Sequence, residues 1–568
     1  MSDERPPPPA GACAAAPKRK AVAVSRAADT WLDSAALRDW RACARRFWLG
    51  QQQAVAPCSA DADADHGPGA RRTDPADHSA VDSAGAAGRS DSPAQPSAAL
   101  PGSLAEAALR ASYPLATVLQ PPAAHDAAAW AQAEARSRQL LSGSGPAAAH
   151  EPGWALIGAC LSSRDGVRVR VDVVQRGAHG WRLFKLRWAT VADEADVDEM
   201  ALAAHVAAHG GLRVASVGLL LVDTDFLYPG HGLYAGLLRE VDLGPVLGTR
   251  DVPAWLLAMQ ALRRAASRPP VPLGAPCTRD GGCPQLSACD LPCEAARPDD
   301  PRTRLDILGR ELADELRHEG HHNVHSVPLA RLVNPRLRRA AQAVQQGRPV
   351  VEPAAGPWLA ALPWPRHWLR IETIGFAIPA WPGTRPYQVL PFQCSLDSQA
   401  QPGAAVQHQG WLAPAGADPR PGFVQRLLQL LGADDGPVLA YNAGFERNRI
   451  TELARQAQHS GDAATATALE ALLPRIVDLF ALARANAYHP DMAGSWSARA
   501  VFEAWVPEAG AHHFALPGWR SLLHAYGATV QQGLPQTQVA VLRRALLAHG
   551  QRHTAALRGL TERLAGGG

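Results

Sequence analysis

The chain has 568 residues, 47% of them hydrophobic, and can therefore form two or more domains with cores of their own. Its formal net charge of +3 is nearly balanced, so bulk charge alone does not indicate a nucleic-acid partner. The longest apolar run, around Val214 to Val222, is far too short to span a membrane, and residues 1–22 lack the apolar core of a secretory signal. We therefore expect a cytoplasmic protein without a membrane partner, in which closely spaced cysteines bind metal rather than form disulfides.

The N-terminal part of the chain alternates between low-complexity and periodic segments. Residues 1–28 are a Pro/Ala-rich tail and residues 52–101 are rich in Ala, Asp, Gly, Ser and Pro, so both are expected to be disordered. Helical apolar patterns cover residues 31–53 and 104–141. The second low-complexity segment thus interrupts a domain that we place at residues 29–300.

A change of period marks the middle of this domain. Helix, three strands, helix and strand in this order indicate an α/β domain with a mixed sheet. Alternating or continuous apolar residues predict strands over 155–160, 167–174 and 181–188, then a helix over 197–209 and a strand over 214–222.

The C-terminal part has a similar mixture of strands and helices. Residues 301–365 are predicted to form short helices followed by a Pro-rich linker, and residues 366–568 a second α/β domain. Strands are predicted at 368–373, 438–441 and 475–479, and helices at 463–472 and up to residue 456.

Three cysteines, Cys277, Cys283 and Cys289, are separated by five residues each in a loop rich in Gly and Pro. Thiolates in such a loop contribute little to packing, but together with one distant cysteine they can hold an iron–sulfur cluster or a zinc ion. Cys43 is the best candidate for the fourth ligand, and Cys293 is a weaker one. The alternative is that these thiols are buried or incidental.

A first group of polar residues lies at the ends of two neighbouring predicted strands. A metal-dependent nuclease needs carboxylates there to hold Mg²⁺, and often a lysine beside them. Asp172 closes one strand, but the next strand offers Lys185 and Arg187, two cations where one carboxylate is needed. These residues indicate either a nuclease site that has decayed or an aspartate beside a solvated basic strand.

Together with Cys43 and the cysteine triad, this arrangement over residues 31–295 resembles RecB-like nucleases of the PD-(D/E)XK type, whose catalytic domain is stapled by a four-cysteine [4Fe–4S] cluster. The resemblance implies that Asp172 is the retained first acid, that Lys185 replaces the second acid and that Arg187 replaces the catalytic lysine. Ala203 stands where a helix usually offers a glutamine. In a rival register Lys185 is the catalytic lysine and Leu183 replaces the acid. The implied cluster ligands are Cys43, Cys277, Cys283 and Cys289.

A second group of polar residues follows the pattern of two-metal exonucleases, in which four acids on one sheet hold the ions that activate water. The expected trace is Asp-x-Glu on the first strand, Asn-x-x-x-acid after a later strand, and a further Asp. The chain offers Arg370-Ile-Glu372, then Asn442 with Glu446, then Asp478. The first acid has therefore become an arginine.

The segment from Trp368 to the C-terminus resembles a bacterial family known as domain of unknown function 2779, which pairs such a unit with the stapled nuclease-like unit. That family is similar to DEDD-type 3′–5′ exonucleases with an RNase H-like fold. The resemblance implies metal ligands at Glu372 and Glu446, with Asp478 as a further acid and Asn442 in a supporting role. The matching motifs are Glu372-Thr, Gly383-Thr-Arg-Pro-Tyr, Pro391-Phe-Gln-Cys-Ser-Leu, Tyr441-Asn-Ala-Gly-Phe-Glu, Tyr488-His-Pro and Gly494-Ser-Trp-Ser.

The departures from this family fall on its chemistry. Arg370 stands at the first Asp, Asp397 at a position that is usually His, His553 at the last Asp, and His549 at the Tyr before it. An arginine within about 4 Å of a divalent ion repels it by several kcal/mol, so two ions are not expected. We expect Arg370 to pair with one of the remaining glutamates. His553 either ligates Mn²⁺ or Zn²⁺ or is simply exposed on its helix.

These features favour a degenerate nuclease-related protein that binds DNA or RNA, or scaffolds a protein partner, and that retains its iron–sulfur staple. The alternative is an active nuclease in which Glu372, Glu446, Asp478 and His553 hold Mg²⁺ or Mn²⁺. A third possibility is a purely structural protein. No phosphate-binding or dinucleotide glycine pattern is present, so no nucleotide cofactor is expected.

Overall fold

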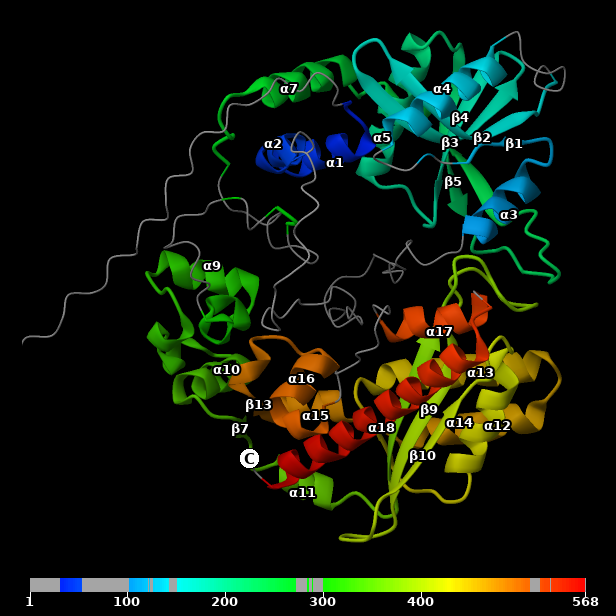
Figure 1. Ribbon diagram of the computed structural model, residues 1–568. Helices are drawn as coiled ribbons and strands as arrows, with labels where there is room; N and C mark the ends of the chain where they lie inside the picture. The colour runs from blue at the N-terminus through cyan, green and yellow to red at the C-terminus, as the bar shows by residue number, and fades with distance from the viewer. Residues whose placement is uncertain are drawn as a thin grey trace, which may run out of the picture.

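The computed structural model describes residues 31–53, 102–120, 122, 126–142, 151–271, 283–285, 289, 300–510, 521–531 and 533–566. Both segments that were expected to be disordered lie almost entirely outside these residues, as do Cys277 and Cys293. Within the described residues, two mixed α/β units are visible, each built on its own sheet and covered by helices (Figure 1).

The N-terminal unit contains a six-stranded sheet in the order β1-β2-β3-β4-β5-β6. Strands β2 to β4 form an antiparallel meander, whereas β4 and β5 are parallel and are joined through helix α5. The alternation along β3 buries every second residue, beginning at Val167, because successive side chains of a strand point to opposite faces. The bounds are β1 Thr117–Val118, β2 Ala155–Ser163, β3 Val167–Gly177, β4 Gly180–Arg187, β5 Val214–Val222, β6 Leu238–Asp242 and α5 Glu194–His209.

The helices of this unit differ from the expected ones at two places. The single helix expected over residues 31–53 is broken at Cys43, whose backbone is extended with φ −169° and ψ 126°. The helix expected over 104–141 is likewise two helices with β1 between them. The bounds are α1 Ser34–Ala42, α2 Ala44–Gln53, α3 Gly102–Ser112, α4 Ala127–Leu141, α6 Gly244–Leu247 and α7 Val252–Arg264.

The C-terminal unit contains a five-stranded sheet in the order β10-β9-β8-β11-β12. Strand β9 is antiparallel to both of its neighbours, and β8, β11 and β12 are parallel. The bounds are β8 Arg366–Ile374, β9 Leu390–Gln399, β10 Gln407–Leu412, β11 Val438–Ala440 and β12 Ile476–Asp478.

Helices cover the two faces of this sheet, and β8 shows how its residues are divided between them (Figure 1). Leu369 and Ile371 pack against α12, α13 and α14. Trp368 faces the other way and donates a hydrogen bond from its indole nitrogen to Thr561 of α18 at 3.0 Å. Arg370 and Glu372 lie on this second face because they keep the period of two. The bounds are α12 Pro419–Leu431, α13 Ala443–His459, α14 Ala463–Leu472 and α18 Gln536–Gly566.

The segment between the two sheets packs on the C-terminal unit. Its apolar residues share one core with Trp368, Leu439 and Leu557. The part that its prolines suggested to be a linker contains strand β7 and helix α11, and β7 pairs with β13. The elements of this segment are α9 Arg310–His318, α10 Pro335–Gln346, β7 Val350–Val351, α11 Ala355–Ala360 and the 3₁₀ turns Pro301–Thr303, Leu305–Leu308, Val324–Ser326 and Leu329–Arg331. The C-terminal unit also contains β13 Ala487–Tyr488, α15 Leu479–Asn486, α16 Ala498–Trp505, α17 Leu522–Gln531 and the 3₁₀ turns Leu473–Arg475, Pro490–Met492 and Pro507–Ala509.

A small apolar cluster joins the two units. Tyr228 and its neighbours, in the loop after β5, pack with Ile378 of the C-terminal unit. The Tyr228 N–H donates to the Thr384 carbonyl at 3.0 Å, and the Gly383 N–H donates to the Tyr228 carbonyl at 2.8 Å. The motif Gly383-Thr-Arg-Pro-Tyr therefore contributes to the contact between the units.

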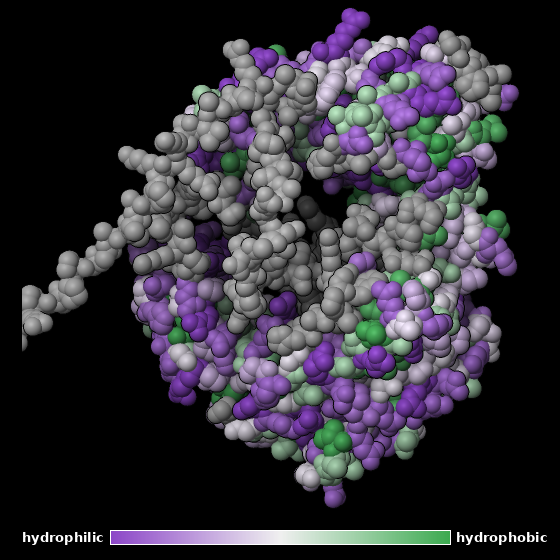
Figure 2. Space-filling view, viewed as in Figure 1, coloured by the Kyte–Doolittle hydropathy of each residue, from purple (hydrophilic) through white to green (hydrophobic). Residues whose placement is uncertain are grey.

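Among the residues that are coloured by hydropathy in Figure 2, most are hydrophilic, and apolar residues are scattered between them. Among the described helices, none combines the length and the apolar character that crossing a bilayer requires.

Candidate functional site

The N-terminal unit gathers its polar residues between β3, β4 and α5. Val173 pairs with Phe184 in the antiparallel register, so Asp172 and Lys185 are the next facing pair. Glu199 of α5 is only 2% exposed and lies against this pair. It forms ion pairs with Lys185, with Arg38 of α1, and with Arg187, whose Nη2 lies 2.7 Å from Glu199 Oε2.

These ion pairs make the polar cluster of β4 and α5 a buried ion-pair network. Arg187 also pairs with Asp196 of α5, and Asp172 Oδ2 accepts a hydrogen bond from the Leu186 N–H at 2.9 Å. Burial, reinforced by the positive charge of Arg187, lowers the pKa of Lys185 to about 7, although Asp172 acts in the opposite direction. The side chain of Lys185 is 15% exposed, so the interpretation of β4 as a solvated basic strand is wrong.

Sequence reasoning missed the acids on α5. Glu194 and Asp196 lie in the first turn of α5, where a negative charge interacts favourably with the helix dipole, and Asp198 and Glu199 follow them on the same helix. Glu199 precedes Ala203 by four residues and so lies on the same face of α5, one turn before the position at which the RecB-like pattern offers a glutamine. The run of acids before an apolar helix was the available signal.

Three of the four cysteines expected to hold a cluster lie among the described residues. Cys43 lies at the break between α1 and α2, and Cys43 and Cys283 are half-buried while Cys289 is buried. Arg45, two residues after Cys43, donates to the Cys289 carbonyl at 3.4 Å and to the Pro269 carbonyl at 3.0 Å. The start of α2 is thus tied to the chain around Cys289, but among the described residues the three sulfur atoms of Cys43, Cys283 and Cys289 do not all lie within 4.8 Å of one another. The complete four-cysteine site extends beyond the described residues and stays a prediction.

In the C-terminal unit, Glu372 of β8 lies beside Arg370 and beside two histidines of α18. Arg370 binds Glu372 through two contacts, Nε to Oε1 at 2.8 Å and Nη2 to Oε2 at 3.2 Å. His549 and His553 are one turn apart on α18. A ring nitrogen of each histidine and an oxygen of Glu372 all lie within 4.8 Å of one another. Two imidazoles and one carboxylate at this spacing form a donor set for a transition-metal ion.

Glu446, in the first turn of α13, is 1% exposed. Its Oε2 has no hydrogen-bond partner among the residues that the structure describes. Burial raises the pKa of Glu446 to about 8; Arg370 opposes this shift, and the negative charges of Glu372 and Asp478 add to it. Asp478 itself caps α15 by accepting a hydrogen bond from the Phe480 N–H at 2.9 Å.

The approach of α18 to the sheet depends on Gly550. A Cβ at this position would lie 2.1 Å from Ser395 Oγ and 2.5 Å from Gln393 Nε2. Gln393 also donates to the Leu546 carbonyl at 2.8 Å. Since Ser395 faces Arg370 and Gln393 faces Glu372 across β8 and β9, the motif Pro391-Phe-Gln-Cys-Ser-Leu holds α18 above the site.

His553 and Asp397, two residues that differ from the family pattern, have different surroundings. His553 is 3% exposed, so the expectation that it lies in solvent is wrong; its ring packs edge-on against Phe502 with centroids 5.0 Å apart. Asp397 accepts hydrogen bonds from His408 Nδ1 and Thr554 Oγ1, both at 2.8 Å. Asp397 therefore links β9, β10 and α18.

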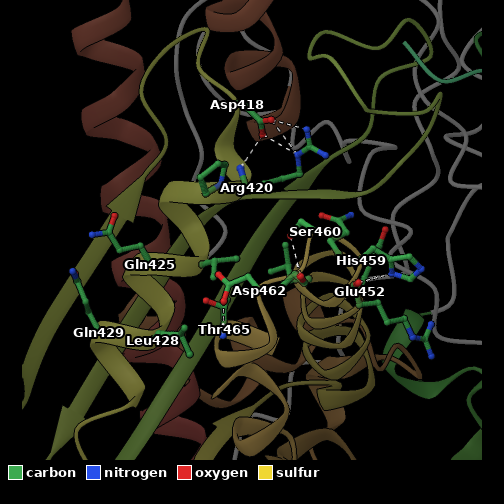
Figure 3. A pocket seen from close by; sticks show the side chains of 16 residues that line it. Asp418, Arg420, Gln425, Leu428, Gln429, Glu452, His459, Ser460, Asp462 and Thr465 are labelled. Carbon is green, nitrogen blue, oxygen red and sulfur yellow. Dashed lines mark hydrogen bonds and ion pairs between the residues drawn. The ribbon is translucent and has the colours of Figure 1, made fainter. Parts of the chain in front are cut away.

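An open groove of about 1300 Å³ lies elsewhere on the C-terminal unit, between α12, α13 and α14 (Figure 3). On its rim Arg420 pairs with Asp418 at 2.6 Å, and Glu452 and His459 lie along α13. None of its lining residues belongs to the group of Glu372, His549 and His553, which we call the Glu372 cluster. The groove is therefore not where the metal-binding side chains of the described residues gather.

Comparison with known proteins gives one match. No curated protein and no solved structure matches the chain. A family described as Domain of unknown function (DUF2779) matches residues 367–497. This range includes Glu372, Glu446 and Asp478 but ends before His549 and His553. Residues 367–497 are therefore similar to this family, in agreement with the motifs seen in the sequence.

Proposed function

We propose that this chain is a nuclease-related protein that binds a nucleic-acid strand at the Glu372 cluster without two-metal hydrolysis. The observation that carries the proposal is the ion pair between Arg370 and Glu372. A guanidinium now stands on the strand where the family pattern places an acidic metal ligand.

The topology of both sheets supports a nuclease ancestry. The order β10-β9-β8-β11-β12, with β9 antiparallel to its neighbours, fits the RNase H-like fold that the resemblance implies. The succession β2-β3-β4-α5-β5, with β4 and β5 parallel, fits the PD-(D/E)XK fold. Folds host many functions, so the activity is argued from the sites.

The charge of Arg370 disfavours hydrolysis by two metal ions and favours the binding of phosphate. At an effective dielectric constant of about 20, a unit charge and a divalent ion about 4 Å apart repel each other by several kcal/mol. A guanidinium also forms strong charge-assisted hydrogen bonds with phosphate, and Arg370 would form them in exchange for those that it makes with Glu372. Its side chain is 26% exposed, so a phosphate can reach it from solvent.

The N-terminal unit supports the same conclusion. A Mg²⁺ ion at Asp172 would compete with the cations that already occupy Glu199. Removing those partners would leave buried charges uncompensated, at a cost of several kcal/mol. We propose that this unit, held by its cysteine cluster, acts as a scaffold for the C-terminal site.

The test uses the full chain, purified anaerobically, with labelled single- and double-stranded DNA and RNA. We expect salt-dependent binding that persists in EDTA, and no cleavage with Mg²⁺. Arg370→Gln should weaken binding about 10-fold, the size of one charge-assisted phosphate contact. Arg455→Gln, an exposed arginine at the groove of Figure 3, is the matched control and should leave binding unchanged. Cleavage that disappears in Glu446→Ala would overturn the proposal.

A second candidate is a hydrolase that uses one softer ion. The convergence of Glu372, His549 and His553 within 4.8 Å favours it. Mn²⁺ or Zn²⁺ would then polarise a phosphate oxygen when bound there, and these three side chains would hold it. This candidate predicts Mn²⁺-dependent cleavage that is lost in His553→Ala, and the absence of cleavage with either ion would exclude it.

A further inference from the structure

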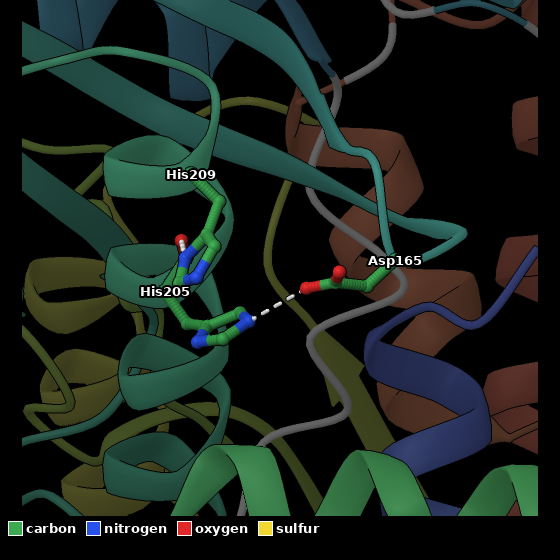
Figure 4. Close-up of side chains that lie close together, drawn as sticks. All are labelled: Asp165, His205 and His209. Atoms are coloured by element: carbon green, nitrogen blue, oxygen red, sulfur yellow. Dashed lines mark hydrogen bonds and ion pairs between the residues drawn. The ribbon is translucent and has the colours of Figure 1, made fainter.

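The last turn of α5 meets the turn between β2 and β3 at three side chains that the proposed function does not use (Figure 4). His205 Nε2 lies 3.2 Å from Asp165 Oδ2. The rings of His205 and His209 stack with centroids 3.9 Å apart and an interplanar angle of 30°. One ligand atom from each of the three residues lies within 4.8 Å of the other two.

We propose that Asp165, His205 and His209 bind one divalent transition-metal ion of the zinc or nickel class. Two histidines four residues apart on one helix face, with a carboxylate from a second element, are a donor set that such ions favour. The protein would supply three ligands and leave at least one position to water.

The hydrogen bonds around the cluster prepare it for an ion. His209 Nδ1 donates to the His205 carbonyl at 2.9 Å, which leaves the Nε2 lone pair of His209 available. The Gln260 side chain of α7 donates to the Asp165 carbonyl at 3.2 Å and fixes the turn. In the bound state the three donor atoms would lie about 2.1 Å from the ion.

Charge and access favour the same site. His209 is the last residue of α5, and the carbonyl end of a helix carries partial negative charge that attracts a cation. The side chain of His205 is 10% exposed while that of Asp165 is 42% exposed, so an ion can enter from the side of the turn. A bound ion would cross-link the β2–β3 hairpin to α5.

The test compares zinc stoichiometries of the full chain after removal of any affinity tag, using Zn²⁺ and a chromophoric competing chelator. The double variant His205→Gln with His209→Gln should bind one equivalent fewer than the native chain. Zinc at the cysteines or at the Glu372 cluster is present in both proteins and cancels in the comparison. No nucleic acid is involved, so the result is independent of the proposed function.

The matched control is His459→Gln. His459 also ends a helix and its Nδ1 bonds the carbonyl four residues earlier, Arg455 O, at 2.6 Å, but it belongs to no group of three metal-binding side chains among the described residues. It should keep the native stoichiometry. Asp165→Asn, on an exposed turn, should weaken the same site about 10-fold if the double variant does not fold. Equal stoichiometry and affinity in native and altered chains would overturn the proposal.

Discussion

Glu199 and Glu446 are both almost fully buried carboxylates beside a sheet, yet their surroundings have opposite charge balance. Glu199 is in contact with Lys185, Arg187 and Arg38. Glu446 has a carboxylate oxygen without a hydrogen-bond partner among the described residues, and its pKa is raised to about 8. The first carboxylate is paired with cations and structural, whereas the second has an unpaired oxygen and only the half-buried Arg370 as a nearby cation that opposes its pKa shift.

The comparison shows two ways in which cations beside a sheet are accommodated. At β4, Lys185 and Arg187 pair with acids of α5, so the cluster is an internal ion-pair network. At β8, Arg370 pairs with Glu372 of its own strand, and Glu446 keeps an oxygen without a hydrogen-bond partner among the described residues. An unpaired buried polar atom costs stability, and its presence is a reason to look for a ligand.

The largest expected effect is on the compensated side. Glu199→Ala should lower the free energy of unfolding by about 3–5 kcal/mol, because it leaves buried cations without their counter-charge. Urea unfolding at neutral pH measures this, with Glu470→Gln on an exposed position of α14 as the control. A decrease of the free energy of unfolding by less than about 1 kcal/mol would mean that these ion pairs do not stabilise the N-terminal unit.

The next largest expected effect is the pH dependence of stability that Glu446 confers. Because the pKa of Glu446 is about 8 in the folded chain and about 4.5 when exposed, the folded state binds more protons between these values. Stability from this group is therefore present at low pH and is lost as pH rises toward 8, at no more than about 1.4 kcal/mol per pH unit. Glu446→Gln should remove this slope in unfolding experiments between pH 5 and 8. An unchanged slope would show that Glu446 is ionised in the folded protein.

The smallest effect tests how α18 reaches the sheet. Gly550→Ala should destabilise the chain by about 1–3 kcal/mol, because the new methyl group collides with Ser395 and Gln393. Gly444→Ala in α13 is the control, since its only close neighbour is Asn442 Oδ1 at 3.9 Å, and it should be neutral or stabilising by up to about 1 kcal/mol. Equal behaviour of the two variants would mean that α18 can shift without cost.

Some elements were predictable and others were not, for physical reasons. Strands β3 and β4 follow from alternating apolar residues, and β2 and β5 from continuous apolar runs, both of which are local properties of the sequence. The break at Cys43 does not, because residues 31–53 keep an apolar helical pattern on both sides of it. The prolines after Gln346 suggested a linker, yet this segment packs on α18, since tertiary burial outweighs local preference.

The sequence by itself showed cations at Lys185, Arg187 and Arg370 where the resemblances imply other groups, and it contains the motifs of the family that matches residues 367–497. Only the tertiary structure decided which side chains compensate them. Glu199 meets Lys185 through the packing of α5 on the sheet, and His553 is buried beside Glu372 through the approach of α18 at Gly550. These contacts join residues on separate elements, and the angle and distance at which a helix packs on a sheet are set by all the side chains between them.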